Sequence, residues 1–294
     1  MVKTDFHKTG IPTGFPYLDK ITGGLHPSEL VTITGYPLVG KTTLALNIAR
    51  NVAVDSHIPV VYFSLEAPAV QIAKRLIKTE SGIDIHKLKG AVKITQEELD
   101  DLDLLCAELG KAPLYIDDTP LLKIEDFRDE VKHLVKDKGI KLAIVDYFQL
   151  MTRPEEIKDR KLELPTILNS LSSTAKEFGI AIIATSQIQI CRPMAYHIFR
   201  NDFVHKFFEY DYGYVVDISD AIIYMENESE IVKHYAAPIP VESCGTTIYV
   251  AKNGVALSER TTLQFNPDRM CFQTPDPVKT VINLEWKITG PCPG

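Results

Sequence analysis

The stretch "GYPLVGKTTLA", residues 35–45, follows the short apolar run "LVTIT" and leads into a segment with the composition of a helix. It matches the pattern G-x-x-x-x-G-K-[ST] in full, with Gly35, Gly40, Lys41 and Thr42 at the fixed positions. Two glycines let the backbone bend so that successive N–H groups point at a polyphosphate, which the positive end of the following helix also attracts. The stretch therefore predicts a nucleoside triphosphate site at a strand-to-helix turn.

The side chains of this loop predict a site for ATP and Mg²⁺. Lys41 is placed to reach the β- and γ-phosphates, and the Thr42 hydroxyl is placed to ligate Mg²⁺. A chance match in a glycine-containing turn is disfavoured, because the pattern falls between a predicted strand and a predicted helix. The predicted nucleotide-binding residues are those of the loop and the first helical turn: Gly35, Pro37, Val39, Gly40, Lys41, Thr42 and Thr43.

Apolar runs alternate with helical segments over the rest of the chain. We predict strands at about 31–34, 58–66, 113–118, 141–150, 180–188, 220–225, 246–252, 261–265 and 281–287. We predict helices at about 41–53, 67–82, 94–110, 124–139 and 163–178. Strands that are apolar throughout and alternate with helices indicate an α/β fold, with a mostly parallel central sheet and helices on both of its faces.

The chain is expected to form one large domain with short appendages. Residues 1–30 are predicted to be a linker and lead-in segment, because 10–30 is dense in Gly, Pro and Thr and favours an extended path with turns. The ATPase domain is placed at 31–275, with an insertion at about 195–215, and a C-terminal strand and tail at 276–294. No second domain boundary is predicted.

The composition excludes several classes of protein. No apolar run approaches the roughly 20 residues that span a bilayer, and the N-terminus lacks the apolar core of a signal peptide, so we predict a cytoplasmic protein without a membrane partner. Five scattered cysteines without a C-x-x-C pair indicate reduced thiols. The net charge of −7 disfavours coating of nucleic acid by the whole surface, so DNA binding would use a local patch or a channel formed by several subunits.

Three predicted strands end in polar side chains that would complete an ATPase site. Glu66 closes "VVYFSLE", Asp146 closes "LAIVD" and Gln187 closes "IAIIATSQ". Ligands of open α/β sheets gather at the carboxyl ends of the strands, so we expect these side chains near the phosphate loop. In this order they are candidates for the base that orients the attacking water, the acid that holds Mg²⁺ through water, and the amide that senses the γ-phosphate. Taken singly, each is instead an ordinary cap or turn residue.

With these motifs the sequence resembles the ATPase domain of the DnaB-type replicative DNA helicases, a RecA-like family of P-loop NTPases. The resemblance covers residues 10–272 and rests on "GIPTGFPYLDKITGGL", "GYPLVGKTTLALNIA", "FSLEAPAVQIAKRL", "APLYIDDTP", "IVDYFQLM", "IIATSQI", "RPM", and "AKNG" followed by "LQFNP". It implies a homo-hexamer that hydrolyses ATP between neighbouring subunits and moves along single-stranded DNA through a central channel. It also implies a helicase loader or a primase as a further partner.

The resemblance implies roles for the residues at matching positions. The loop residues bind phosphate and Mg²⁺, Glu66 is the catalytic base and Asp146 is the Walker B acid that holds Mg²⁺. Gln187 couples the state of the nucleotide to DNA. Arg75, nine residues after Glu66, matches an arginine in the polar network of the family's site.

The tail motif departs from the family pattern Lys-x-Arg-Asn-Gly, in which the lysine and the arginine reach into the neighbour's ATP site. The segment "AKNG" keeps Lys252 and lacks the arginine. Arg260, in the longer loop expected to follow, either substitutes as the trans-acting arginine or is a solvated surface residue. Without a trans arginine, hydrolysis would be slower by about 10³ or more, as for such fingers elsewhere.

A second departure follows "RPM", where the family has a short Arg-Glu-Ser-Gly loop that touches the DNA backbone. The chain has the longer insertion "AYHIFRNDFVHKFFEYDYGYVVD", in which only Arg200 aligns and is the predicted DNA-binding residue. Eight aromatic residues lie between Tyr196 and Tyr214. They either stack on single-stranded bases or pack beneath the insertion or against an adjacent subunit.

Two functions from different classes remain open at this point. The first is a DNA helicase motor, favoured by the intact loop and the three polar strand ends. The second is a DnaB-like accessory or regulatory ATP-binding protein of a plasmid or phage, favoured by the altered tail motif, the replaced DNA loop and the acidic charge balance. A RecA-like recombinase or clock-type ATPase is a third reading, against which "DYFQLM" and "RPM" argue. The sequence lacks the family's N-terminal domain, so we expect either an excised fragment or a naturally short form.

Overall fold

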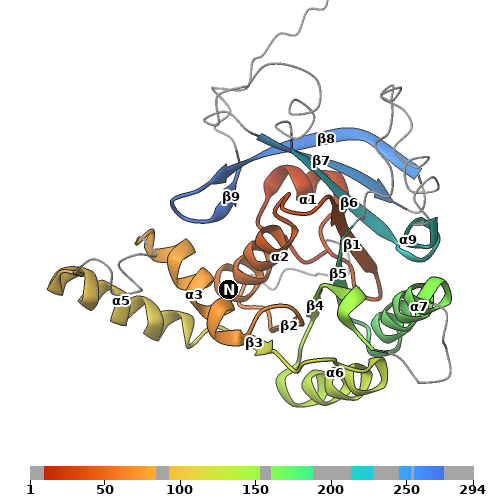
Figure 1. The fold of residues 1–294 in the computed structure, drawn as a ribbon, viewed down its shortest axis with the longest axis horizontal. Helices are drawn as coiled ribbons and strands as arrows, with labels where there is room; N and C mark the ends of the chain where they lie inside the picture. The colour runs from red at the N-terminus through yellow and green to blue at the C-terminus, as the bar shows by residue number, and fades with distance from the viewer. Residues whose placement is uncertain are drawn as a thin grey trace, which may run out of the picture.

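The computed structural model describes residues 10–83, 93–152, 160–187, 213–227, 245–252 and 255–274. The strands within these ranges are β1 Leu30–Gly35, β2 Val60–Ser64, β3 Leu114–Asp117, β4 Leu142–Asp146, β5 Ala181–Gln187, β6 Ala221–Asn227, β7 Gly245–Lys252, β8 Val255–Asn266 and β9 Cys271–Gln273. They form one sheet in the order β3-β2-β4-β5-β1-β6-β7-β8-β9 (Figure 1). The pairs from β3 to β6 are parallel, and the pairs from β6 to β9 are antiparallel.

The helices follow the predicted alternation with the strands. They are α1 Pro16–Thr22, α2 Lys41–Arg50, α3 Ala69–Ser81, α5 Gln96–Leu109, α6 Ile124–Lys138, α7 Arg160–Phe178 and α9 Gly213–Ile218. A π-helical turn, Asn51–Asp55, continues α2, and a 3₁₀ turn, Phe148–Leu150, follows β4. In Figure 1, β7 and β8 cross the top of the view above α1 and α2, and α5 extends to the far left, where it contacts α3.

Helices cover both faces of the sheet, because successive strand residues point to opposite sides. In β4, Ile144 belongs to a buried cluster with Leu44 of α2 and Ile72 of α3. The next residue, Val145, points to the opposite face of the sheet and belongs to a second buried cluster, which includes Phe127 of α6. Each fully buried side chain of this size stabilises the fold by about 1.5–3 kcal/mol. The predicted α/β fold, with a mostly parallel sheet between two helical layers, is confirmed.

Local signals set several helix ends as predicted. Thr95 caps α5 by accepting a hydrogen bond from the Glu98 N–H at 3.2 Å, and the Glu98 carboxylate accepts one from the Thr95 N–H at 3.0 Å. Gly139 ends α6 with a φ of 68°. A Cβ at Gly139 would meet no other atom within 4 Å, so glycine is needed there for its backbone angle alone.

The lead-in segment differs from its expected extended path. It contains α1, which begins at a proline in its first turn, a position that needs no N–H donor. Asp19 of α1 accepts hydrogen bonds from the Thr13 N–H at 2.8 Å and the Thr13 hydroxyl at 2.7 Å, while Phe15 and Leu18 are buried. Glycine and proline density predicted the turns, but the apolar residues that fold this segment onto the sheet override an extended path.

Other boundaries differ from the prediction in ways with a physical cause. The strand expected at 141–150 ends at Asp146, because the chain turns into the 3₁₀ helix at Phe148. The strand expected at 261–265 is part of the longer β8, so Arg260 lies in a strand and not in a loop. The expected strand at 281–287 and most of the insertion at 195–215 lie outside the described residues.

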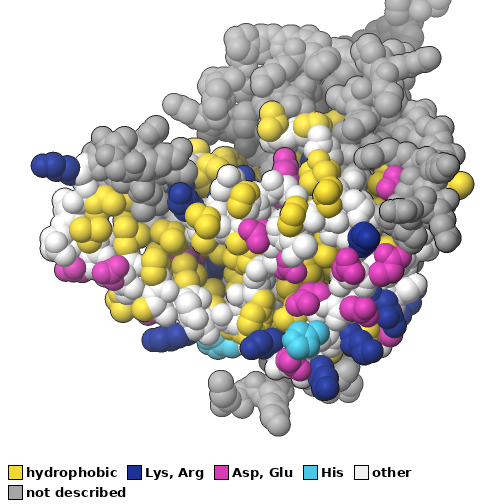
Figure 2. Space-filling model, turned by 60° about the horizontal axis from the view of Figure 1, so that its bottom comes forward, with side chains coloured by type: hydrophobic (Ala, Val, Ile, Leu, Met, Phe, Trp, Pro, Cys, Tyr) yellow, Lys and Arg dark blue, Asp and Glu magenta, His cyan; other side chains and the backbone are white. Residues whose placement is uncertain are grey.

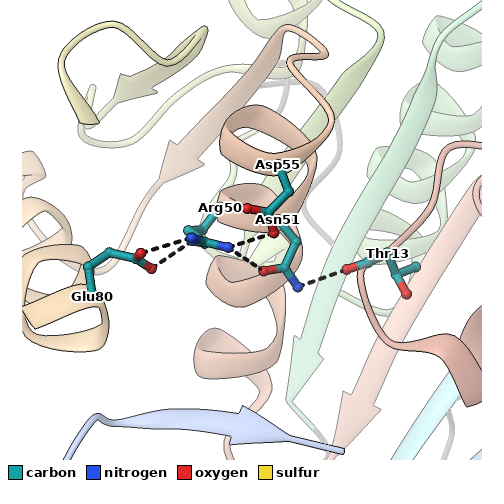
Figure 3. A network of polar contacts seen from close by, with 5 residues as sticks. All are labelled: Thr13, Arg50, Asn51, Asp55 and Glu80. Atoms are coloured by element: carbon teal, nitrogen blue, oxygen red, sulfur yellow. Dashed lines mark hydrogen bonds and ion pairs between the residues drawn. The ribbon is translucent and has the colours of Figure 1, made fainter. Parts of the chain in front are cut away.

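A polar network joins the end of α2 to two other segments (Figure 3). Arg50 forms ion pairs with Asp55 of the π-helical turn and with Glu80 of α3, each at 2.6 Å. Asn51 donates a hydrogen bond from its side-chain amide to the Thr13 carbonyl at 3.1 Å. The side chains of Arg50 and Glu80 are both only partly exposed to solvent, so this ion pair is screened less than a surface ion pair. The network fixes α3 and the lead-in against α2.

The surface around α6 carries both signs of charge. Figure 2 shows lysine and arginine interspersed with aspartate and glutamate at the lower right, and hydrophobic side chains gathered further left. The exposed charged residues of α6 include Glu125, Asp126, Arg128, Asp129 and Lys132. A surface of this kind offers no continuous basic stripe for nucleic acid. Within the described ranges, none of the helices has the length and apolarity needed to cross a bilayer.

Candidate nucleotide site

The turn between β1 and α2 has the predicted loop geometry, and it leaves no room for side chains at its two glycines. Gly40 adopts a φ of 99° at the start of α2, and a Cβ there would lie 2.7 Å from Cζ of Phe272. A Cβ at Gly35 would lie 2.6 Å from the Met225 carbonyl oxygen. Phe272, in β9, donates its N–H to the Asn47 side chain of α2 at 2.8 Å. The loop is therefore enclosed by β6 and β9, neither of which the loop sequence indicates.

Lys41 lies over the start of this loop. Its Nζ donates hydrogen bonds to the carbonyl oxygens of Gly35 at 3.0 Å and Tyr36 at 2.7 Å. The residue is 9% exposed, which is low for a lysine. Phosphate oxygens carry negative charge and accept stronger hydrogen bonds than neutral carbonyls. The ammonium group is therefore held where it can exchange these partners for a polyphosphate.

Asp146 ends β4 and lies beside the first turn of α2. Its Oδ1 accepts hydrogen bonds from the Thr185 hydroxyl at 2.6 Å and the Thr42 hydroxyl at 3.3 Å. Its Oδ2 accepts one from the Tyr62 hydroxyl at 2.8 Å, and the residue is only 4% exposed. Carboxylate and hydroxyl oxygens at one point suit Mg²⁺, which binds proteins through few direct oxygen ligands and keeps several waters. The structure thus brings together the two residues predicted to hold the metal.

Tyr62 is a site residue that the sequence reasoning missed. It lies in β2, fully buried, and burial of its ring raises the pKa of its hydroxyl well above the usual range, as do the charge of Asp146 and the hydrogen bond to it. A signal was present in "VVYFS", since a buried tyrosine hydroxyl in an apolar strand needs a polar partner. The sequence could not say that this partner would be the acid of the next strand in the sheet.

Substituting Tyr62→Phe should lower the free energy of unfolding by about 1–3 kcal/mol, because a buried carboxylate oxygen loses its donor. The folded state retains the Tyr62 proton to higher pH than the unfolded chain does. The stability from this group is therefore complete below about pH 10 and is lost as the pH rises further, so the difference from wild type should narrow there. Urea unfolding at pH 8 and above pH 10 measures both effects. The exposed Tyr17→Phe is the matched control, and equal stability of Tyr62→Phe and wild type at pH 8 would contradict the prediction.

Glu66 and Arg75 lie on the α3 side of the same region. Ser64 of β2 lies opposite Asp146 of β4 in the parallel register, and Glu66 comes two residues after Ser64 in the chain. Glu66 is exposed, and the charges of both Glu66 and Arg75 act on the Tyr62 hydroxyl, the first raising and the second lowering its pKa. The structure therefore places a carboxylate and a guanidinium near the Asp146 cluster, while the catalytic roles of Glu66 and Arg75 stay predictions.

Gln187 lies at the end of β5, directly opposite Gly35 of β1 in the parallel register. The backbone of β5 is thus brought to the start of the phosphate loop, while the role of Gln187 as a γ-phosphate sensor stays a prediction. A second glutamine, Gln149, which the sequence reasoning did not consider, donates its side-chain amide to the Gln187 carbonyl at 3.1 Å. Three polar strand ends and the phosphate loop therefore meet at one edge of the sheet.

The residues predicted to act on a neighbour or on DNA are placed only in part. Lys252 ends β7 and its backbone pairs with Ala221 of β6 and Val255 of β8. Arg260 lies in β8 opposite Tyr249. Arg200 lies outside the described residues. Their predicted roles stay predictions.

Comparison with known proteins identifies the family. The model of the DnaB-like helicase C-terminal domain matches residues 10–194, more than half of the chain. The chain belongs to this family. The match contains the phosphate loop, Glu66, Asp146 and Gln187, and ends within the range over which the resemblance was expected. The RecA-like fold of the DnaB-like ATPase domain is confirmed with it.

Individual relatives agree with this family. The replicative DNA helicase DnaB of Leifsonia xyli subsp. xyli is 37% identical over 188 residues, which are 63% of this chain and 40% of that protein. The solved ATPase domain of G40P superimposes with a TM-score of 0.78 at 23% identity, over 93% of this chain and 94% of that one. A DnaB-like replicative helicase, solved to describe its interactions with primase, gives 0.76 at 24% identity, over 93% and 64%. The match spans about two fifths of the length of the DnaB proteins of Leifsonia xyli subsp. xyli and Geobacillus stearothermophilus.

Proposed function

We propose that this chain is the motor domain of an ATP-dependent replicative DNA helicase, which hydrolyses ATP at subunit interfaces to move along single-stranded DNA. The observation that carries the proposal is the contact between Thr42 and Asp146, at 3.3 Å, beneath a complete phosphate loop. It joins the phosphate-binding helix to an acid from a different strand, an arrangement that magnesium-dependent NTP hydrolysis requires. Relatives named replicative DNA helicases support the motor over an accessory protein.

The chemistry follows from the positions of the chain's own groups. Mg²⁺ bound with ATP supplies positive charge against the charge that develops on the phosphates. Lys41 exchanges the carbonyls of Gly35 and Tyr36 for phosphate oxygens, and the N–H groups of the loop orient the polyphosphate. Glu66, at the exposed edge of the site, orients the attacking water and accepts its proton.

A neighbouring copy is proposed to complete this site, with the chain acting as one of six subunits of a ring. Leu38, in the phosphate loop, is 98% exposed and has a φ of 65°. Glu66, which follows β2, is exposed as well. A site open to solvent cannot exclude water around the reacting phosphate, so closure by another subunit favours hydrolysis. We propose that Lys252 and Arg260 act in trans on the neighbour's nucleotide.

Substituting Arg260→Ala should slow ATP turnover in the assembled ring by about 10³, the usual effect of losing an arginine finger. The physical reason is that a fixed guanidinium stabilises charge on the transferred phosphate. Turnover per subunit is measured together with molecular mass in solution, to confirm that assembly persists. Arg128→Ala, at an exposed arginine on α6, is the matched control. Unchanged turnover in an assembled Arg260→Ala ring removes Arg260 from this role.

DNA is proposed to bind inside the ring and not over the outer surface. The net charge of −7 and the mixed charges around α6 argue against a broad basic face. Arg200 is the proposed contact to the strand. We also propose a helicase loader or a primase as a partner, because the structure of a DnaB-like replicative helicase with this fold is described together with its interactions with primase.

The rate of ATP hydrolysis with and without single-stranded DNA, measured with the molecular mass in solution, tests the proposed function. A hexamer whose turnover is strongly stimulated by single-stranded DNA is the expected result. A chain that assembles with MgATP and hydrolyses it at the same rate with and without DNA contradicts the motor and supports a regulatory ATPase. A matched double-stranded oligonucleotide serves as the control for non-specific stimulation.

A further inference from the structure

The side chain of Gln149 connects the turn after β4 to the end of β5. Gln149 lies in the 3₁₀ helix that follows Asp146, and its Nε2 donates to the Ser186 hydroxyl at 2.8 Å and to the Gln187 carbonyl at 3.1 Å. A carbonyl oxygen can only accept a hydrogen bond, so the nitrogen of the amide must face Gln187. The orientation of the amide is therefore fixed by its partners.

These contacts begin where the backbone pairing between the two strands stops. β4 and β5 pair in register as far as Val145 opposite Ala184. Beyond that point two side-chain links continue the connection, from Thr185 to Asp146 and from Gln149 to Ser186 and Gln187. The last residues of β5 are thus tied on one side to β1 by the backbone ladder, and on the other side to the Asp146 turn by side chains.

Packing alone does not explain a glutamine at this position. The Oε1 of Gln149 is buried and has no hydrogen-bond partner among the described residues. A buried acceptor without a donor costs free energy, whereas a leucine of similar volume would fill the space without that cost. The nitrogen half of the amide, and hence the link to β5, is the part of the side chain that offsets this cost.

We propose that Gln149 is a positioning residue for Gln187, which it couples to the Asp146 turn so that the end of β5 follows the occupancy of the nucleotide site. Gln149 touches neither nucleotide nor DNA in this role. Its effect passes through the Gln187 backbone, whose register opposite Gly35 places it at the phosphate loop. This inference rests on the proposed function, because it assumes that the nucleotide changes the affinity for single-stranded DNA.

The coupling is measured as the ratio of two affinities. A fluorescent single-stranded oligonucleotide is titrated with the protein, once with a non-hydrolysable ATP analogue and Mg²⁺ and once with ADP and Mg²⁺. Gln149→Leu removes both donors at nearly constant volume, and Gln149→Glu places an acceptor against the Gln187 carbonyl. Gln96→Leu, at an exposed glutamine whose side-chain amide donates to Asp100, is the matched control.

We expect both Gln149 variants to bind the ATP analogue within about 2-fold of wild type, and the ratio of DNA affinities to fall by about 5-fold or more. The control should keep the wild-type ratio. A merely structural role would lower nucleotide binding and both DNA affinities together and leave the ratio unchanged, so that result overturns the inference. A wild-type ratio retained by well-folded Gln149 variants overturns it as well. A wild-type ratio near one contradicts the proposed function, and the inference falls with it.

Discussion

Lys41→Ala should abolish ATP binding at ordinary nucleotide concentrations, with a loss of about 100-fold or more in affinity. The ammonium is the one side-chain cation that the loop places against the phosphates in the part of the chain described, and its charge-assisted hydrogen bonds are worth about 3 kcal/mol or more together. Titration with a fluorescent ATP analogue in the presence of Mg²⁺ measures the loss. Turnover should disappear with binding.

The substitution also removes the hydrogen bonds of Lys41 to the Gly35 and Tyr36 carbonyls, so loop disorder must be separated from lost phosphate contacts. Lys41→Met keeps most of the side-chain volume and should lose affinity equally. Lys176→Ala, at an exposed lysine of α7, is the matched control for loss of a positive charge. Normal ATP hydrolysis by Lys41→Ala would exclude this loop as the nucleotide site.

Glu66→Gln should leave nucleotide binding close to wild type and lower turnover by about 10²–10⁴, the usual contribution of a general base. The amide keeps the size of the carboxylate but cannot accept the proton of the attacking water. Glu66 is exposed, and among the described residues the hydrogen bonds of Lys41 and Thr42 go to other partners. The groups that bind the nucleotide should therefore stay in place when Glu66 is replaced. Single-turnover hydrolysis, with analogue affinity measured alongside, separates chemistry from binding.

Glu97→Gln, at an exposed glutamate of α5, is the matched control for this change of charge. Equal turnover of Glu66→Gln and wild type would transfer the role of base to another residue. A large loss of affinity would instead assign Glu66 to nucleotide binding. Both outcomes leave the Lys41 assignment intact, so the two experiments test different halves of the site.

The phosphate loop and the alternation of strands and helices could be predicted because they depend on residues close together in the chain. Gly40 needs a positive φ, and the helix that follows is set by its own composition. The apolar runs at β1, β4 and β5 are buried on both faces, so every residue carries the signal. The capping box of Thr95 and Glu98 is likewise complete within four residues.

Features that depend on distant residues were missed. The α1 helix forms where an extended path was expected, because Phe15 and Leu18 bury against the sheet. β9 was not predicted, since its three residues carry no periodic pattern, although Phe272 lies against Gly40. Arg260 was expected in a loop and lies in β8. In each case a contact across many residues, and not local propensity, sets the structure.

The order of residues by itself predicted a nucleoside triphosphate site, because the loop pattern is specified by two glycines, a lysine and a threonine within eight residues. Only the tertiary structure decided which groups surround that loop. Tyr62 and Thr185 lie far from Asp146 in sequence, yet their hydroxyls fix both oxygens of its carboxylate. The register of parallel strands brings them there, and register is set by packing over the whole sheet and not by any short segment.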